Sequence, residues 1–311
     1  MFDGYRKSLK HPEAEELFDL GFYRPLAWLF VRAVHRTPVT PNQVTMLSLA
    51  ASLAAAYCFA FGGLSLLWAG AAWYAVANIL DCADGQLARV QGSGTPNGRL
   101  VDGIADYVGT AAIFLGIGIG FSGLGMNLWP ETVVAGLSSV FHAMIFDHRQ
   151  NSFIAARRGD GDFHRREMEK HLGGGITVPD GAGTNGARAD EVGPDGPGTL
   201  RGNTPSAGLV SRLYVGYIRI QHHLMDWFLP APVGDGQAAA LRPEDGTMIR
   251  LWSFLGPTTN RSALIAFALI GRVDLFLWAV IVPGNLWLAA VWYLQRRLDG
   301  RPANPVPGNP S

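Results

Sequence analysis

Long uncharged stretches dominate the hydrophobic pattern of the chain. No Asp, Glu, Lys or Arg occurs between Arg36 and Asp81, a gap of 44 residues. A helix that spans a bilayer needs about 20 mostly apolar residues, so this gap can hold two spans. Buried helices of soluble proteins are usually shorter and keep a polar face. The pattern therefore predicts an all-α integral membrane protein. Six transmembrane helices are expected, at residues 43–62, 65–89, 98–122, 129–148, 250–271 and 274–296.

The first forty residues have a different pattern. Residues 12–36 mix apolar positions with charged ones such as Glu16 and Arg24, and Pro25 bends or breaks the run. This mixture favours an amphipathic helix that lies in the membrane interface. Residues 1–40 are therefore predicted to be an N-terminal interfacial segment. They lack the apolar core of a cleavable signal peptide, so insertion would depend on the internal spans.

A long insertion separates the fourth predicted span from the fifth. It covers residues 150–249. Residues 172–207 are dense in Gly, Pro, Asp, Asn and Thr, and this composition predicts disorder. Residues 208–229 mix apolar and basic positions at helical spacing, which predicts a helix on the membrane surface.

Basic residues are distributed unevenly around the predicted spans. The first four spans lie within residues 41–149 and the last two within residues 250–297, before a disordered tail at 298–311. If both termini lie on one side, only Arg272 of the 25 Lys and Arg residues falls in the loops of the other side. Cytoplasmic loops carry the Lys and Arg excess, so the termini and the insertion are predicted to be cytoplasmic. The formal net charge is zero and no basic cluster with interleaved aromatic residues occurs, so nothing indicates nucleic-acid binding.

The charged residues of the second and third spans form a compact motif. Residues 81–106 follow the spacing D-x2-D-G-x2-A-R-x8-G-x3-D-x3-D. Successive helical residues turn by about 100°. Asp81 and Asp84 therefore share one face of the second span, and Asp102 and Asp106 lie one turn apart on the third. If the two spans pack side by side, the four carboxylates converge near the cytoplasmic interface.

Such a cluster of carboxylates needs positive charge. Like-charge repulsion and desolvation oppose the ionised state of all four groups, and Arg89 and Arg99 could neutralise only two of them. Mg²⁺ and Mn²⁺ prefer carboxylate oxygens, so one or two of these ions are expected. A bound ion could hold the phosphate oxygens of an anionic ligand. Gly85 and Gly98 would let a ligand or a partner helix approach the backbone closely.

The motif resembles the signature of the CDP-alcohol phosphotransferase (CDP-alcohol phosphatidyltransferase) family, and the chain looks like that family over most of its spans. The resemblance implies that Asp81, Asp84 and Asp102 ligate metal. It also implies that Asp106 completes a second metal position and acts as the general base. The residues that it assigns to the nucleotide are Gly85, Ala88, Arg89 and Gly98, with Asn42 and Thr45 at the start of the first span.

The resemblance further implies a transferase of phospholipid biosynthesis, in a bacterial inner (plasma) membrane with its active site on the cytoplasmic side. The hydroxyl group of an acceptor would attack the β-phosphorus of a CDP-linked donor, and CMP would leave. Two donor classes use this signature: CDP-diacylglycerol, which is favoured because it is common among compact six-span members, and CDP-linked headgroups with a lipid hydroxyl as acceptor. Tyr107 follows the last aspartate, where inositol-phosphate members tend to carry Arg, so the acceptor stays open. Membrane lipids are expected partners, and a homodimer is one possible assembly.

Several residues have alternative interpretations. Arg261 lies inside the fifth predicted span, where an Arg indicates function by default. It could bind the phosphate or headgroup of the acceptor, or it could pair with the aspartates. Asn42 could serve only as a helix N-cap. The four aspartates could instead line the path of a metal or proton transporter, which is a different class of protein. His142, Asp147, His148 and Arg149 are predicted to face headgroups rather than to form a second metal site.

Overall fold

The computed structural model describes residue 5 and residues 13–94, 96–158 and 243–299. The described residues are almost entirely helical and contain no strand. The disordered stretch predicted at 172–207 and the surface helix predicted at 208–229 lie outside these ranges, as do residues 300–311 of the predicted tail.

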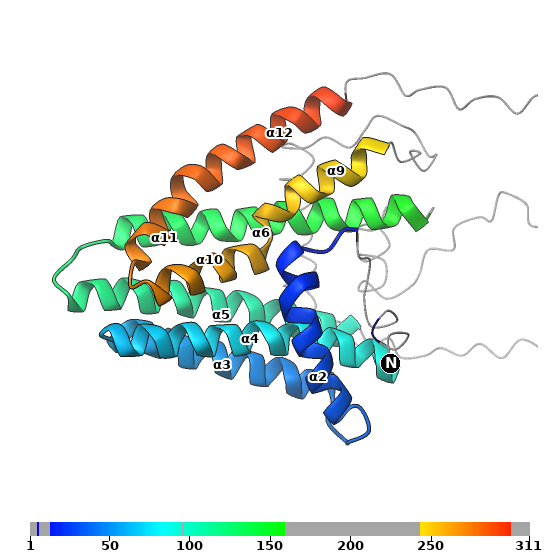
Figure 1. The fold of residues 1–311 in the computed structure, drawn as a ribbon, viewed down its shortest axis with the longest axis horizontal. Helices are drawn as coiled ribbons and strands as arrows, with labels where there is room; N and C mark the ends of the chain where they lie inside the picture. Colours follow the sequence, from blue (N-terminus) through cyan, green and yellow to red (C-terminus); the bar gives the residue numbers. More distant parts are fainter. Residues whose placement is uncertain (1–4, 6–12, 95, 159–242, 300–311) are drawn as a thin grey trace, which may run out of the picture.

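The described helices form an elongated bundle (Figure 1). Its long helices are α3 (Pro41–Phe61), α4 (Leu64–Gln91), α5 (Pro96–Gly123) and α6 (Trp129–Arg158). The C-terminal part consists of α9 (Pro243–Trp252), the 3₁₀ turn η2 (Ser253–Leu255), α10 (Pro257–Leu269), α11 (Val273–Ala279), the π-helical turn η3 (Val280–Gly284) and α12 (Asn285–Asp299). Near the N-terminus, the π-helical turn η1 (Asp19–Tyr23) continues into α2 (Arg24–Val34). Helix α3 packs against α4 and α5, and α10 packs against α4.

Four helical stretches are long and apolar enough to cross a membrane, so the chain is an integral membrane protein. They cover residues 41–61, 64–91, 100–123 and 273–299, and they correspond to the first, second, third and sixth predicted spans. The fourth predicted span lies within the single helix α6, whose apolar run is weakened by Glu131 and His142. The prediction of six spans is therefore not confirmed.

The structure interrupts the predicted fifth span. Residues 250–271 do not form one helix, because η2 ends at Gly256 and α10 begins at Pro257. Gly256 has an extended backbone, with φ −67° and ψ 157°. Pro257 has no N–H to donate, so it fits the first position of a new helix better than the interior of a continuous one. The interruption sets the start of the helix that carries Arg261.

Helix α3 begins at a reciprocal pair of hydrogen bonds. The backbone N–H of Gln43 donates to Thr40 Oγ1 at 3.4 Å, and the backbone N–H of Thr40 donates to Gln43 Oε1 at 3.0 Å. This arrangement is a capping box, which satisfies two of the unpaired donors at a helix start. Thr40 is therefore the N-cap of α3, and the alternative interpretation of Asn42 as the N-cap is wrong.

Two glycines bring α5 very close to α3. A Cβ atom added at Gly116 would lie 2.3 Å from the carbonyl oxygen of Ala56, and one added at Gly120 would lie 2.2 Å from that of Phe59. Small residues at this spacing let helix backbones approach in membranes. The close approach fixes α5 beside α3, and α3 also packs on α4. Helices α4 and α5, which carry the motif, are thus held together through α3.

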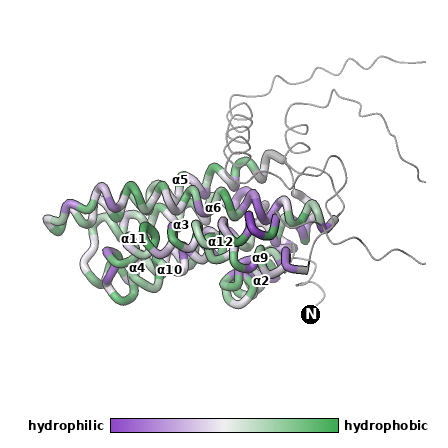
Figure 2. The backbone as a smooth tube through the Cα atoms, turned by 90° about the horizontal axis from the view of Figure 1, so that it is seen from above, coloured by the Kyte–Doolittle hydropathy of each residue, from purple (hydrophilic) through white to green (hydrophobic). Residues whose placement is uncertain are grey.

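Helix α2 crosses the bundle at one end (Figure 1). Its Ala27 and Val31 are fully buried in an apolar cluster that also contains Leu87 of α4. Figure 2 shows strongly hydrophilic stretches near α2 and α9, whereas α3, α5 and α11 are mostly hydrophobic. A helix thus occurs within the predicted interfacial segment, and its location in a membrane interface stays a prediction.

Candidate active site

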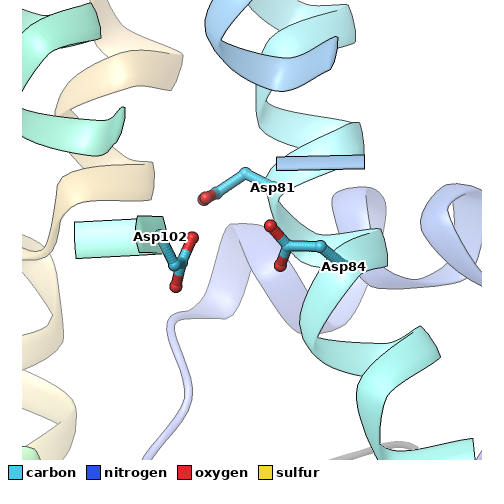
Figure 3. Close-up of side chains that lie close together, drawn as sticks. All are labelled: Asp81, Asp84 and Asp102. Atoms are coloured by element: carbon cyan, nitrogen blue, oxygen red, sulfur yellow. The ribbon is translucent and has the colours of Figure 1, made fainter. Parts of the chain in front are cut away.

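Three aspartates from two helices point toward one another (Figure 3). Asp81 and Asp84 are carried by α4, and Asp102 is carried by α5. One carboxylate oxygen from each lies within 4.8 Å of the other two. Asp84 is buried, whereas Asp81 and Asp102 are partly exposed. The arrangement brings three acidic oxygens together at a distance that one divalent cation could bridge.

The chemistry of this group of oxygens fits a bound cation. Asp102 Oδ1 is buried and has no hydrogen-bond partner among the described residues. An acceptor without a partner is costly to bury unless something else satisfies it. Carboxylate oxygens are hard ligands, which Mg²⁺, Mn²⁺ and Ca²⁺ prefer over softer metals. Asp81, Asp84 and Asp102 therefore form a candidate site for a divalent metal ion.

Thr45 orients one of these ligands. Its hydroxyl group donates to Asp84 Oδ2 at 2.5 Å, and it also lies 3.2 Å from the carbonyl oxygen of Pro41. The bond to Asp84 joins α3 to α4 at the site and fixes the orientation of the Asp84 carboxylate. The family resemblance assigns Thr45 to the nucleotide, whereas the structure shows it in contact with a candidate metal ligand.

Arg261 joins three helices at the same place. Its Nη1 donates to Asp81 Oδ2 at 2.8 Å and to Asn78 Oδ1 at 3.0 Å, and its Nη2 donates to Asp106 Oδ1 at 2.7 Å. Arg261 itself is buried. Of the two interpretations of Arg261, the structure shows the ion pairing with the aspartates. Asn78 was not predicted from sequence, although a buried Asn in an apolar span is a recognisable signal.

Asp106 lies next to the group of three aspartates but is not a member of it. It follows Asp102 by one turn of α5, and Arg261 links it to Asp81. Its side chain is 41% exposed, against 22% for Asp81. Among the motif aspartates joined by Arg261, Asp106 is thus the one more open to a ligand. The predicted convergence holds for Asp81, Asp84 and Asp102, with Asp106 at the edge.

The comparison with protein families agrees with this geometry. Residues 38–160 match the family model described as CDP-alcohol phosphatidyltransferase. The match contains α3, α4 and α5, and with them the four motif aspartates. The chain contains a CDP-alcohol phosphatidyltransferase domain.

Curated relatives of the domain are bacterial. A phosphatidylinositol phosphate synthase of Mycolicibacterium smegmatis is 30% identical over 149 residues, which are 46% of this chain and 61% of that protein. One of the same description from Cutibacterium acnes is 36% identical over 107 residues, 34% of this chain and 50% of that protein. A bifunctional IPC transferase and DIPP synthase of Rubrobacter xylanophilus is 37% identical over 84 residues, 27% of this chain and 19% of that protein. The chain thus spans less than two thirds of these relatives.

The residues predicted to bind nucleotide lie in α3, α4 and α5 of the CDP-alcohol phosphatidyltransferase domain. The guanidinium of Arg89 folds back over Gly85, so a Cβ added at Gly85 would lie 3.4 Å from Arg89 Nη2. Ala88 lies in the last turn of α4, where its carbonyl oxygen accepts from the N–H of Gly92. Gly98 lies in the first turn of α5. Asn42 is exposed on an open groove of about 530 Å³ that is lined by Val39, Asn42, Gln43, Met46 and Leu47.

Among the described residues, the three side chains that lie close enough together to share a metal ion do not include His142 or its neighbours. His142 is 3% exposed and its Nε2 lies 3.0 Å from Asn285 Oδ1, so the prediction that it faces headgroups is wrong. Asp147 accepts a hydrogen bond from Asn151, one turn further along α6. The His142 contact joins α6 to α12, and the Asp147 contact lies within α6.

Proposed function

We propose that this protein transfers a phosphatidyl group from CDP-diacylglycerol to the hydroxyl group of a polar acceptor, with the help of a divalent metal ion, and releases CMP. The observation that carries the proposal is the convergence of Asp81, Asp84 and Asp102 within 4.8 Å, inside a CDP-alcohol phosphatidyltransferase domain. Such a reaction needs positive charge next to a pyrophosphate, and three carboxylates are an effective means of holding it.

Asp81, Asp84 and Asp102 would hold one ion, and Asp106 would complete the position of a second. We propose Mg²⁺ or Mn²⁺, because the candidate ligands are all carboxylate oxygens. A bound ion would offset the negative charge of the donor phosphates and the charge that develops on the leaving CMP. Thr45 keeps Asp84 in position through its 2.5 Å hydrogen bond.

Asp106 would act as the general base. The acceptor oxygen attacks the β-phosphorus, the bond between that phosphorus and the oxygen bridging to the α-phosphate breaks, and CMP leaves with the bridging oxygen. The proton of the acceptor hydroxyl passes to Asp106, which must be ionised and within about 3 Å of the hydroxyl. Arg261 donates to Asp106 Oδ1, so Oδ2 would be the atom that takes the proton.

The proposed nucleotide-binding residues are those that the family signature assigns. Gly85, Ala88, Arg89 and Gly98 would contact the CDP moiety, with Asn42 and Thr45 near its pyrophosphate. The exposed Arg89 guanidinium suits a phosphate, because it is a permanent cation with several donors. Acceptor binding by Arg261 stays a prediction, since in the structure its terminal nitrogens face Asn78, Asp81 and Asp106.

The donor class is supported by the named relatives. The two that match the larger shares of this chain are described as phosphatidylinositol phosphate synthases, which favours a phosphatidyl donor. The relative from Rubrobacter is described as an IPC transferase and DIPP synthase, and it keeps the alternative of a CDP-linked headgroup donor open. Tyr107, which follows the last aspartate, argues against a simple transfer of the inositol-phosphate acceptor to this chain.

We further propose that the protein lies in a bacterial inner membrane with the active site on the cytoplasmic side. Basic residues are concentrated around the loops at the aspartate end of the spans, and such an excess marks the cytoplasmic side. The donor would reach the site from the membrane, and CMP would leave to the cytoplasm. A homodimer remains a proposal that size analysis in detergent would test.

The experiment is a release assay for CMP. The purified protein is mixed with CDP-diacylglycerol or CDP-linked headgroups, with Mg²⁺ or Mn²⁺, and with lipid extracts or polar alcohols as acceptors. Asp106→Asn serves as the blank. Release of CMP from CDP-diacylglycerol by the wild-type protein alone supports the proposal, and release only from headgroup donors supports the alternative. No release from any donor, together with metal uptake into vesicles that contain the protein, would instead support a transporter.

A further inference from the structure

The segment of residues 13–24 bridges the helix that carries two aspartates and the part of the chain that carries Arg261. On one side, Gln86 Nε2 of α4 donates to the carbonyl oxygen of Arg24 at 3.1 Å. On the other side, Arg250 Nη1 of α9 donates to the carbonyl oxygen of Glu15 at 3.1 Å. The 13–24 segment therefore links elements that are more than 150 residues apart in sequence.

Glu16 makes the closest connection to α10. Its Oε1 accepts from the backbone N–H of Thr258 at 3.1 Å, and its Oε2 accepts from the backbone N–H and the hydroxyl of Thr259 at 2.7 and 2.8 Å. Glu16 is only 3% exposed. The first N–H groups of a helix have no intrahelical partner, so acceptor oxygens placed beside them satisfy donors that would otherwise stay unpaired. Glu16 thus supplies from a distance what a local N-cap side chain normally supplies.

Gly256 is adapted to this contact. A Cβ atom added there would lie 2.2 Å from Glu16 Cδ and 2.4 Å from both carboxylate oxygens. The backbone of Gly256 is extended, a conformation open to any residue, so the space around Glu16 is what requires a glycine here. The break between η2 and α10 and the Glu16 carboxylate fit one another.

The start of α10 controls where Arg261 lies. Arg261 follows Thr258 by three residues, about one helical turn, and it reaches Asp81 on α4 and Asp106 on α5. Ser262, the next residue, lies 3.1 Å from the hydroxyl of Tyr23, so the 13–24 segment contacts α10 a second time. A shift of α10 along or about its axis would move the guanidinium away from both aspartates.

We infer that Glu16 is a positioning residue of the active site: by binding the first turn of α10, it sets the place of Arg261 between Asp81 and Asp106. The inference rests on the proposed function for its consequence in catalysis, but the coupling of Glu16 to Arg261 is a property of the folded chain. The hydrogen bonds of the Glu16 side chain go to Thr258 and Thr259 of α10, so its effect on the site passes through Arg261 of the same helix.

Two variants break the contact in different ways. Glu16→Ala removes the acceptor oxygens, and Gly256→Ala keeps Glu16 but fills its space. Glu13→Ala is the matched control, because Glu13 lies in the same segment and pairs with Arg157 of α6 rather than with α10. Each variant is made in the full chain, purified in detergent, and measured alone and combined with Arg261→Gln.

Three readouts are compared. Hydrogen–deuterium exchange of the peptide that contains Thr258 and Thr259 should become faster in both variants and not in the control. Titration with Mn²⁺ should give a dissociation constant changed about tenfold, in the direction in which Arg261→Gln changes it. In the double variant with Arg261→Gln, Glu16→Ala should add no further change in Mn²⁺ binding, because residues that act as a unit are not additive.

Faster exchange with unchanged Mn²⁺ binding would make Glu16 a structural cap only and would overturn the inference. An effect of Glu16→Ala on Mn²⁺ binding that persists at full size in the Arg261→Gln background would overturn it as well. If the wild-type protein binds no Mn²⁺, the proposed function fails, and the inference is then judged by the coupling between Glu16→Ala and Arg261→Gln in the thermal midpoint. Strictly additive midpoints would reject it, and non-additive midpoints would support it.

Discussion

Arg261 Nη2 lies 2.7 Å from Asp106 Oδ1, so the residue proposed as the general base is held by a buried cation from another helix. The same guanidinium is 2.8 Å from Asp81 Oδ2. One arginine therefore sets the relative positions of a candidate base on α5 and a candidate metal ligand on α4. It supports the orientation of both groups without itself being a metal ligand.

Arg261→Gln should lower kcat by about 10²-fold, because Asp106 loses the contact that orients it toward the acceptor. The measurement is the rate of CMP release at saturating donor and acceptor. Arg272→Gln is the control, since Arg272 is an exposed arginine that pairs with Asp274 outside the site. A normal kcat with a raised acceptor KM would contradict the positioning role and support direct binding of the acceptor by Arg261.

Thr45→Val should weaken Mn²⁺ binding by about tenfold, because Asp84 loses the donor that fixes its carboxylate. The hydrogen bond from Thr45 to Asp84 is 2.5 Å long and buried. Val keeps the shape of Thr but not its hydroxyl, and Thr45→Ser keeps the hydroxyl. Titration of the purified variants with Mn²⁺ checks the prediction. If Thr45 instead serves the nucleotide, the KM of the donor rises in Thr45→Val while Mn²⁺ binding is unchanged.

The motif and its helices could be predicted because both depend on local sequence. The spans predicted at 43–62 and 65–89 match α3 and α4, at Pro41–Phe61 and Leu64–Gln91, to within two residues at each end. The helical period alone puts Asp81 and Asp84 on one face. The convergence with Asp102 required one assumption, that α4 and α5 pack with their aspartates facing each other. The structure confirms it, because carboxylate oxygens of Asp81, Asp84 and Asp102 lie within 4.8 Å of one another.

The break before α10 was missed because its stability depends on a distant residue. Hydropathy supports one span at 250–271, and the donors freed by the break are satisfied by Glu16, 242 positions away from Thr258. A local signal was nevertheless present, since Gly256 and Pro257 form a dipeptide that marks turns. The pairing of Arg261 with Asp106 is equally non-local, and sequence could only offer it as one of two alternatives.

Gly120→Ala should destabilise the protein by about 1–3 kcal/mol, because the added methyl group would meet the carbonyl oxygen of Phe59 at 2.2 Å. The atom that the methyl group meets belongs to the backbone of α3 and not to a flexible side chain. Helix α5 must therefore shift away from α3. Gly123→Ala, on the same helix but with nothing within 4 Å, should change the stability by less than about 0.5 kcal/mol. Thermal unfolding in detergent compares the two variants, and equal midpoints would contradict the close packing of α3 and α5.

Glu16 should make the stability depend on pH. Burial and the neighbouring Asp19 carboxylate raise the pKa of Glu16 from an ordinary 4.5 to about 8, although the hydrogen bonds from Thr259 and Thr258 oppose the rise. The folded protein then binds this proton more tightly than the unfolded chain does. This tighter proton binding stabilises the folded protein. The stabilisation is fully present below the unfolded pKa of 4.5 and is lost as the pH rises through the folded pKa of about 8. Glu16→Gln keeps the size and cannot titrate, so the thermal midpoint of the wild type should fall relative to this variant across that window. Asp19→Asn should move the window to lower pH, and midpoint curves of wild type and Glu16→Gln that stay parallel would contradict the prediction.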